Sequence, residues 1–80
     1  MKYTVLIEWD SEIRKFQWDI WLKDKPNVKS DGRVWSNASG LERRLSKAKS
    51  RVAVALQQLK AEHEEDLRNA GKRIEFEGEL

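Results

Sequence analysis

The chain has 80 residues, no cysteine and a formal net charge of +2 at pH 7. This length fits a single domain, residues 1–80, whose core is thin because small domains bury a smaller share of their surface. Without cysteine, neither disulfides nor thiolate metal sites can supplement that core. No apolar run approaches the roughly 20 residues of a membrane-spanning helix, and acidic residues interrupt the N-terminus where a signal peptide is apolar. We therefore expect a cytoplasmic protein.

Two runs of alternating apolar and polar residues predict a β-hairpin at the start of the chain. The runs cover residues 3–9 and 15–23, and the polar residues 10–12 between them favour a turn. Pairing Trp9 with Phe16 brings the apolar side chains of both strands onto one face, and a shift of one residue would send them to water. On this core face we expect Tyr3, Val5, Ile7, Trp9, Phe16, Trp18, Ile20 and Leu22.

A short third strand is predicted near residues 28–30. Pro26 ends the second strand, and the Asp-Gly dipeptide at 31–32 favours a tight turn. The segment therefore forms one short strand or a small hairpin that reaches Trp35.

A long amphipathic helix is predicted over residues 40–69. Ser39 and Glu42 have the spacing of a capping box, and Gly71 is a natural C-cap residue. Such a helix is about 45 Å long, whereas a seven-residue strand is about 23 Å long. The turns past Lys60 therefore overhang the sheet or pack on another chain. The apolar stripe comprises Leu41, Leu45, Ala48, Val52, Ala55, Leu56 and Leu59.

A closing edge strand is predicted after the helix, because Ile74 and Phe76 alternate with charged residues that would guard a sheet edge. The predicted fold class is α+β. It is a small antiparallel sheet of order β-β-β-α-β, with one long amphipathic helix packed on one face.

The residue types that enzymes use are sparse here. The chain has one histidine, His63, and neither a cysteine nor a glycine-rich nucleotide loop. The acidic residues at 62–66 around it resemble a metal-ligand set, but few of them share a helix face. A solvated acidic helix end is the interpretation we adopt. We therefore expect no catalytic residue, no cofactor and no bound metal.

The middle of the chain is basic and its end is acidic. Residues 38–60 carry six basic side chains and one acidic one, and residues 61–80 carry three and seven. A basic patch would contact phosphates, with Trp35 as a stacking platform. The alternative is that these charges are only the solvated side of an amphipathic helix. The predicted basic patch comprises Arg43, Arg44, Lys47 and Arg51.

Trp21 falls on the face opposite the predicted core, with Leu6 on the neighbouring strand and Ile13 nearby. An exposed apolar patch on a sheet favours a protein interface, which either a homodimer or a foreign partner would satisfy. The alternative is that a lone outward tryptophan only shields its strand. The predicted partner-binding residues are Leu6, Ile13, Trp21 and Trp35. A protein-binding module is the first functional hypothesis, and nucleic-acid binding is the second.

Three segments resemble antitoxins of the HicB type. Residues 1–10 (MKYTVLIEWD) resemble the first strand of that family, and residues 28–32 (VKSDG) resemble its third strand and turn. Residues 67–74 (LRNAGKRI) resemble its passage from helix to edge strand. The predicted strand order is also that of the partial RNase-H-like domain of the family. The chain departs from the family in keeping one proline after the second strand, and we expect no C-terminal DNA-binding module.

The resemblance implies a non-catalytic, antitoxin-like or inhibitor-like protein that masks a partner, such as a small basic ribonuclease toxin of the HicA type. It implies no nuclease activity, because the sequence shows no carboxylate constellation for two metal ions. The toxin contacts of the family follow no transferable motif, so the resemblance assigns no individual residue.

Overall fold

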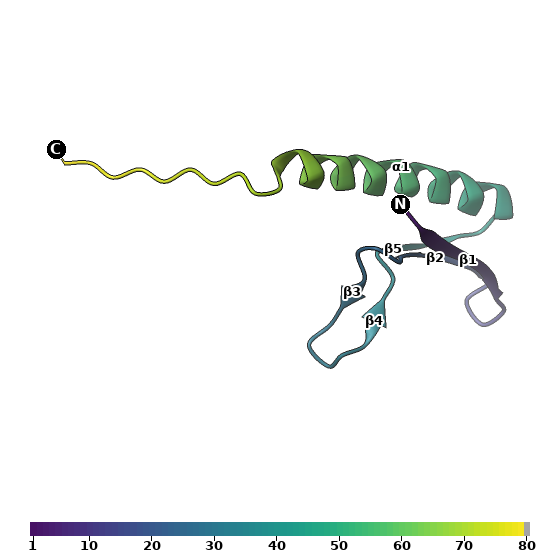
Figure 1. Cartoon of the computed structure of the whole chain (residues 1–80). Helices are drawn as coiled ribbons and strands as arrows, with labels where there is room; N and C mark the ends of the chain where they lie inside the picture. The colour runs from purple at the N-terminus through teal and green to yellow at the C-terminus, as the bar shows by residue number, and fades with distance from the viewer. Residues whose placement is uncertain (80) are drawn as a thin grey trace.

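The computed structural model describes residues 1–79, and this part of the chain forms a sheet, a small hairpin and one long helix. Strands β1, β2 and β5 make an antiparallel sheet in the order β1-β2-β5, and β3 pairs with β4. The helix lies along one face of the sheet, and the β3–β4 hairpin projects from the other side (Figure 1). The predicted α+β class, with a small antiparallel sheet and one long helix, is confirmed. The elements are β1 Tyr3–Asp10, β2 Lys15–Leu22, β3 Asn27–Val28, β4 Val34–Trp35, β5 Ala38–Glu42 and α1 Leu45–Asn69.

The register between β1 and β2 is the predicted one. Trp9 faces Phe16, and the pairs Ile7–Trp18 and Val5–Ile20 follow along the ladder. The Trp9 and Phe16 rings meet edge to face with centroids 4.9 Å apart, a favourable aromatic geometry. The apolar alternation therefore sets the register of this hairpin, as one-sided burial requires.

Residues 38–42 form β5 instead of the first turn of the helix, so the predicted capping box of Ser39 and Glu42 is wrong. The helix begins at Leu45, and the preceding residue makes no capping hydrogen bond through its side chain. Gly40 of β5 faces Trp18 of β2, and this pairing buries the indole to 7% exposure. Burying a large apolar side chain contributes roughly 1.5–3 kcal/mol, more than the about 1 kcal/mol that a cap contributes. Residues 38–42 are therefore more stable as a strand paired with β2 than as a capped first turn of the helix.

The predicted strand after the helix is not formed within the described residues. Beyond a turn at 70–71, residues 72–79 have no regular structure and run away from the body of the protein (Figure 1). Ile74 and Phe76 are 79% and 91% exposed. The reason is geometric: β5 already pairs with β2, and the long helix releases the chain beyond the end of the sheet. The order β-β-β-α-β, one of the observations behind the HicB-type resemblance, is therefore not seen.

The core lies between β2, β5 and the helix. The helix contacts β2 and β5, and its small residues Ala48 and Ala55 let it approach the sheet closely. Tyr3 and Trp9 of β1, which we predicted on the core face, stay 49% and 48% exposed. One helix thus covers only part of the face that the strands present to it. The buried core comprises Trp18, Ile20, Leu22, Ala48, Val52 and Ala55.

Helix α1 is one continuous element of 25 residues. Its turns past Lys60 extend beyond the sheet (Figure 1), as predicted. Within residues 1–79, no helix is both long enough and apolar enough to cross a membrane.

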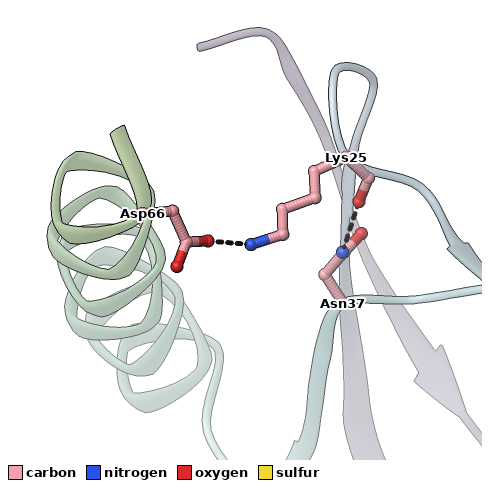
Figure 2. A network of polar contacts seen from close by, with 3 residues as sticks. All are labelled: Lys25, Asn37 and Asp66. Atoms are coloured by element: carbon pink, nitrogen blue, oxygen red, sulfur yellow. Dashed lines mark hydrogen bonds and ion pairs between the residues drawn. The ribbon is translucent and has the colours of Figure 1, made fainter. Parts of the chain in front are cut away.

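A polar network ties the overhanging turns back to the sheet. Lys25, in the loop after β2, forms an ion pair with Asp66 of the helix (Figure 2). Asn37 holds that loop: its Nδ2 donates to the Lys25 carbonyl at 2.9 Å, and its Oδ1 accepts from the Leu22 N–H at 2.8 Å. The hydrogen bond with Lys25 lowers the pKa of Asp66, and the same contact raises the pKa of Lys25. Both partners are solvent-exposed, so the tie is a weak one.

Candidate functional site

The face of the sheet that points away from the helix carries an apolar patch. Alternation along each strand puts Leu6 of β1, Trp21 of β2 and Leu41 of β5 on this face. Leu6, Ile13 and Leu41 are 42%, 46% and 48% exposed, and Trp21 is half-buried. We call these four residues the outer apolar patch.

The strand register brings Leu6 and Trp21 together. Thr4 faces Trp21 and Leu6 faces Asp19, so Leu6 is the diagonal neighbour of Trp21. Diagonal neighbours in a sheet lie within reach of an aromatic side chain. The two form one apolar half of the patch.

Ile13 and Leu41 form the other half. Leu41 faces Gln17 across the ladder, and Ile13, from the β1–β2 turn, lines a shallow hollow with both of them. Asp19, which faces Ser39, separates the two halves. Leu41 escaped the sequence prediction because residues 40–42 were assigned to the helix, whose stripe would have taken it into the core.

Trp35 lies apart from the sheet, on the β3–β4 hairpin. It is 53% exposed, and the cross-strand pair Val28 and Val34 is 56% and 58% exposed. The hairpin projects from the side of the sheet opposite α1 (Figure 1). The strand register places the outer apolar patch on that same side. The hairpin therefore adds exposed apolar side chains to the side of the molecule that α1 leaves uncovered.

The predicted basic patch is divided by the structure. Arg43 and Arg44 precede the helix, Lys47 lies in its first turn, and all three are exposed. Arg51 instead donates from Nε to Glu42 Oε1 at 3.1 Å. Trp35 is on the hairpin across the sheet from the helix (Figure 1). The structure therefore does not bring the predicted stacking platform to the basic patch.

A different tryptophan lies next to basic residues. A groove lined by Trp9, Ile13, Arg14, Lys15 and Arg43 opens at the β1–β2 turn. Arg14 has a φ of 54°, the left-handed region that few non-glycine residues adopt. We call Trp9, Arg14, Lys15 and Arg43 the basic groove. Sequence reasoning missed it because Trp9 was assigned to the core and Arg43 is distant in sequence from the turn.

The acidic groups near His63 make no metal centre. Within residues 1–79, no three side chains of the metal-binding types lie close enough to hold an ion. Glu64 instead lies 4.0 Å from Lys60, one helical turn away, and Asp66 pairs with Lys25.

Comparison with known proteins returns no relative: no protein-family model matches the chain, and no curated protein or solved structure matches it either. The functional proposals therefore rest on the exposed side chains, their charges and the sheet register.

Proposed function

We propose that this chain is a non-catalytic protein-binding module that docks a partner protein on the outer apolar patch. The observation that carries the proposal is that the helix covers one face of the sheet while the other exposes Leu6 beside half-buried Trp21. Beyond Asp19 on the same face, Ile13 and Leu41 are exposed as well. Exposed apolar side chains gathered on one face, with polar residues around them, mark interaction surfaces. Tryptophan is also the residue type most enriched among those that dominate binding energy.

The charges around the patch favour a basic partner. Alternation and register place three acidic residues of β1 and β2 on the same face as Leu6, against one basic residue, Lys15. The acidic residues are Glu8, Asp10 and Asp19. Acidic groups beside an apolar patch attract a partner whose contact surface is positively charged. A small basic toxin masked by an antitoxin-like or inhibitor-like protein has this chemistry, and it is the form of the function that we favour.

Replacing Trp21 tests this proposal. We expect Trp21→Ala to weaken partner binding by roughly 30-fold or more, the loss typical of a residue that dominates an interface. The partner is first captured from a lysate of the source organism on the immobilised chain, and its affinity is then measured by calorimetry with purified proteins.

Two further variants make this experiment decisive. Leu41→Glu puts a charge on an exposed position of the patch, and it should weaken binding without unfolding the chain, as circular dichroism checks. Val54→Glu alters an exposed helix residue away from the patch and should bind as the wild type does. Unchanged affinity in both Trp21→Ala and Leu41→Glu would contradict the proposal.

Nucleic-acid binding is the second candidate, and the basic groove favours it. Three basic side chains surround Trp9, which is 48% exposed. Basic residues around an exposed aromatic ring suit a single strand, whose phosphates pair with the charges while a base stacks on the ring. The basic groove shares Arg43 with the basic patch predicted from the sequence, but its stacking residue is Trp9 and not Trp35.

Salt dependence tests this candidate. Three phosphate contacts predict that the logarithm of the affinity for a single-stranded oligonucleotide falls with a slope of about −2 against the logarithm of salt concentration. Fluorescence anisotropy measures the slope, and Arg14→Glu and Arg43→Glu should each reduce its magnitude. Absence of measurable binding at low salt would rule the candidate out.

A further inference from the structure

One helix leaves part of the core face of the sheet uncovered. Helix α1 packs on β2 and β5, and Tyr3 and Trp9 on the same face of β1 remain about half exposed. A groove of about 620 Å³ runs between the start of β1 and the helix. Its lining includes Met1, Tyr3, Leu56, Lys60, His63 and Leu67.

The chain also exposes more surface than a compact protein of its size. Its accessible surface is 7033 Å² at a mass of 9.4 kDa, for which the scaling of folded monomers gives about 5,000 Å². The radius of gyration is 17.7 Å, against about 12 Å for a compact domain of this length. The extended residues 72–79 account for part of the excess. A standard protein interface buries only about 800 Å² on each partner, so enough surface remains for one.

Three leucines form a straight ridge on the groove side of the helix. Leu45, Leu56 and Leu67 are spaced at equal intervals of eleven residues, and eleven residues make three turns to within about 20°. Leu45 and Leu67 are 43% and 64% exposed, and Leu56 is half-buried. The ridge is symmetric about Leu56. A two-fold axis at Leu56 therefore places Leu45 of one chain against Leu67 of a second copy, and the reverse, as a self-complementary interface requires.

The charges of the helix match the same arrangement. Its first half, residues 45–57, carries three basic residues and no acidic one, whereas residues 58–69 carry four acidic and two basic residues. Antiparallel packing sets the basic half of each helix against the acidic half of the other. Lys49 lies in line with the ridge, two turns before Leu56. The two-fold axis places it opposite His63 of the second copy and next to Glu64. Parallel packing would instead bring like charges together, which disfavours it.

We propose that this groove and ridge are a two-fold interface with a second copy of the chain, in which the two α1 helices pack antiparallel across Leu56. The second helix covers the part of the core face that the first leaves open. The interface lies on the side of the sheet opposite the outer apolar patch, so a partner protein can bind there while the dimer persists.

Cysteine cross-linking tests the position of the axis, because the chain has no cysteine of its own. Leu56→Cys should give a covalent dimer under mild oxidation, since residue 56 meets its own copy only if the axis passes there. Val54→Cys is the matched control, because residue 54 is exposed and points to the opposite side of the helix. A mixture of Leu45→Cys and Leu67→Cys proteins should cross-link between the two. Equal cross-linking of Val54→Cys and Leu56→Cys would overturn the proposal.

Sedimentation equilibrium tests the association itself. The wild type should be a dimer at micromolar concentrations, and Leu67→Glu, at an exposed position, should raise the dissociation constant roughly 100-fold. Lys49→Glu and Glu64→Lys should each weaken the dimer, and the double variant should restore it because the opposite charges then meet again. A wild type that stays monomeric at a concentration of about 100 μM would overturn the proposal, because a standard-size interface gives a lower Kd. The proposal would also be overturned if Leu41→Glu abolished the dimer while Leu67→Glu left it intact, because the copies would then meet through the outer apolar patch.

Discussion

Gly40 is the residue on which the packing of Trp18 depends. A Cβ atom at position 40 would lie 2.6 Å from the indole ring of Trp18, closer than any ordinary contact. Among the described residues the buried indole Nε1 has no hydrogen-bond partner, and such a donor costs about 1–3 kcal/mol. Close packing of the ring against the backbone of β5 must offset that cost.

We therefore predict that Gly40→Ala lowers the free energy of unfolding by about 1–3 kcal/mol, because the Trp18 ring or β5 has to move. Urea denaturation followed by tryptophan fluorescence measures the change. Gly78→Ala is the control, since a Cβ atom there meets nothing within 4 Å. A Gly40→Ala protein as stable as this control would show that the ring is not held by β5.

At the scale of elements, the turns of α1 past Lys60 are tied to the loop after β2 by the exposed ion pair between Lys25 and Asp66. The pKa of Asp66 is lowered in the folded protein, so its contribution is present above the unfolded pKa of about 3.9 and is lost as the pH falls through the lowered value. The pKa of Lys25 is raised, so its contribution is present below about 10.4 and is lost as the pH rises through the raised value. The ion pair therefore contributes in full between about pH 4 and about pH 10, where Asp66 is ionised and Lys25 is protonated.

We predict that the last turns of the helix, residues 60–69, fray when the pH falls below about 4, while the core helix over 48–56 stays formed. Backbone carbon chemical shifts measured by NMR across the titration report both segments. Asp66→Asn should show a smaller shift change in the same direction already at pH 7, because the tie that it removes is weak. Identical shifts in Asp66→Asn and wild type at pH 7 would mean that the ion pair does not hold the helix end.

At the scale of the whole molecule, residues 72–79 extend away from the folded body (Figure 1). We predict that a chain ending at Lys72 keeps the free energy of unfolding of the full chain, because burial, not chain length, provides stability. A chain ending at Gln58 is the contrast, since it loses Leu59, which packs against the core, together with the Lys25–Asp66 tie. A loss of stability on ending the chain at Lys72 would show that the tail contacts the body, in the monomer or in the dimer.

Of the three proposed surfaces, the dimer interface and the basic groove lie close together. In the antiparallel dimer, the end of the second helix lies near Leu45 and so near Arg43 of the basic groove. Oligonucleotide binding and dimer formation would therefore compete, whereas partner binding on the outer apolar patch would not.

Local pattern was sufficient for the first hairpin and for most of the helix. Strict alternation in residues 3–9 and 15–23 predicts both the strands and their register, because a slip of one residue would expose every apolar side chain. The same alternation predicts that Leu6 and Trp21 face away from the core. The helix stripe from Leu45 to Leu59 likewise needs no tertiary information, since its period is that of an α-helix.

Only the tertiary structure determines the secondary structure of two segments, residues 38–42 and 74–76. Both segments fit two local structures, and the choice depends on whether a strand edge lies within reach. Residues 38–42 pair with the free edge of β2. The Trp18 ring packs against Gly40, which has no Cβ atom, and this burial stabilises the chain more than a capping box would. The overhanging helix carries Ile74 and Phe76 away from every edge. The basic groove around Trp9 likewise exists only because folding brings Arg43 beside the β1–β2 turn, a long-range contact that no local pattern contains.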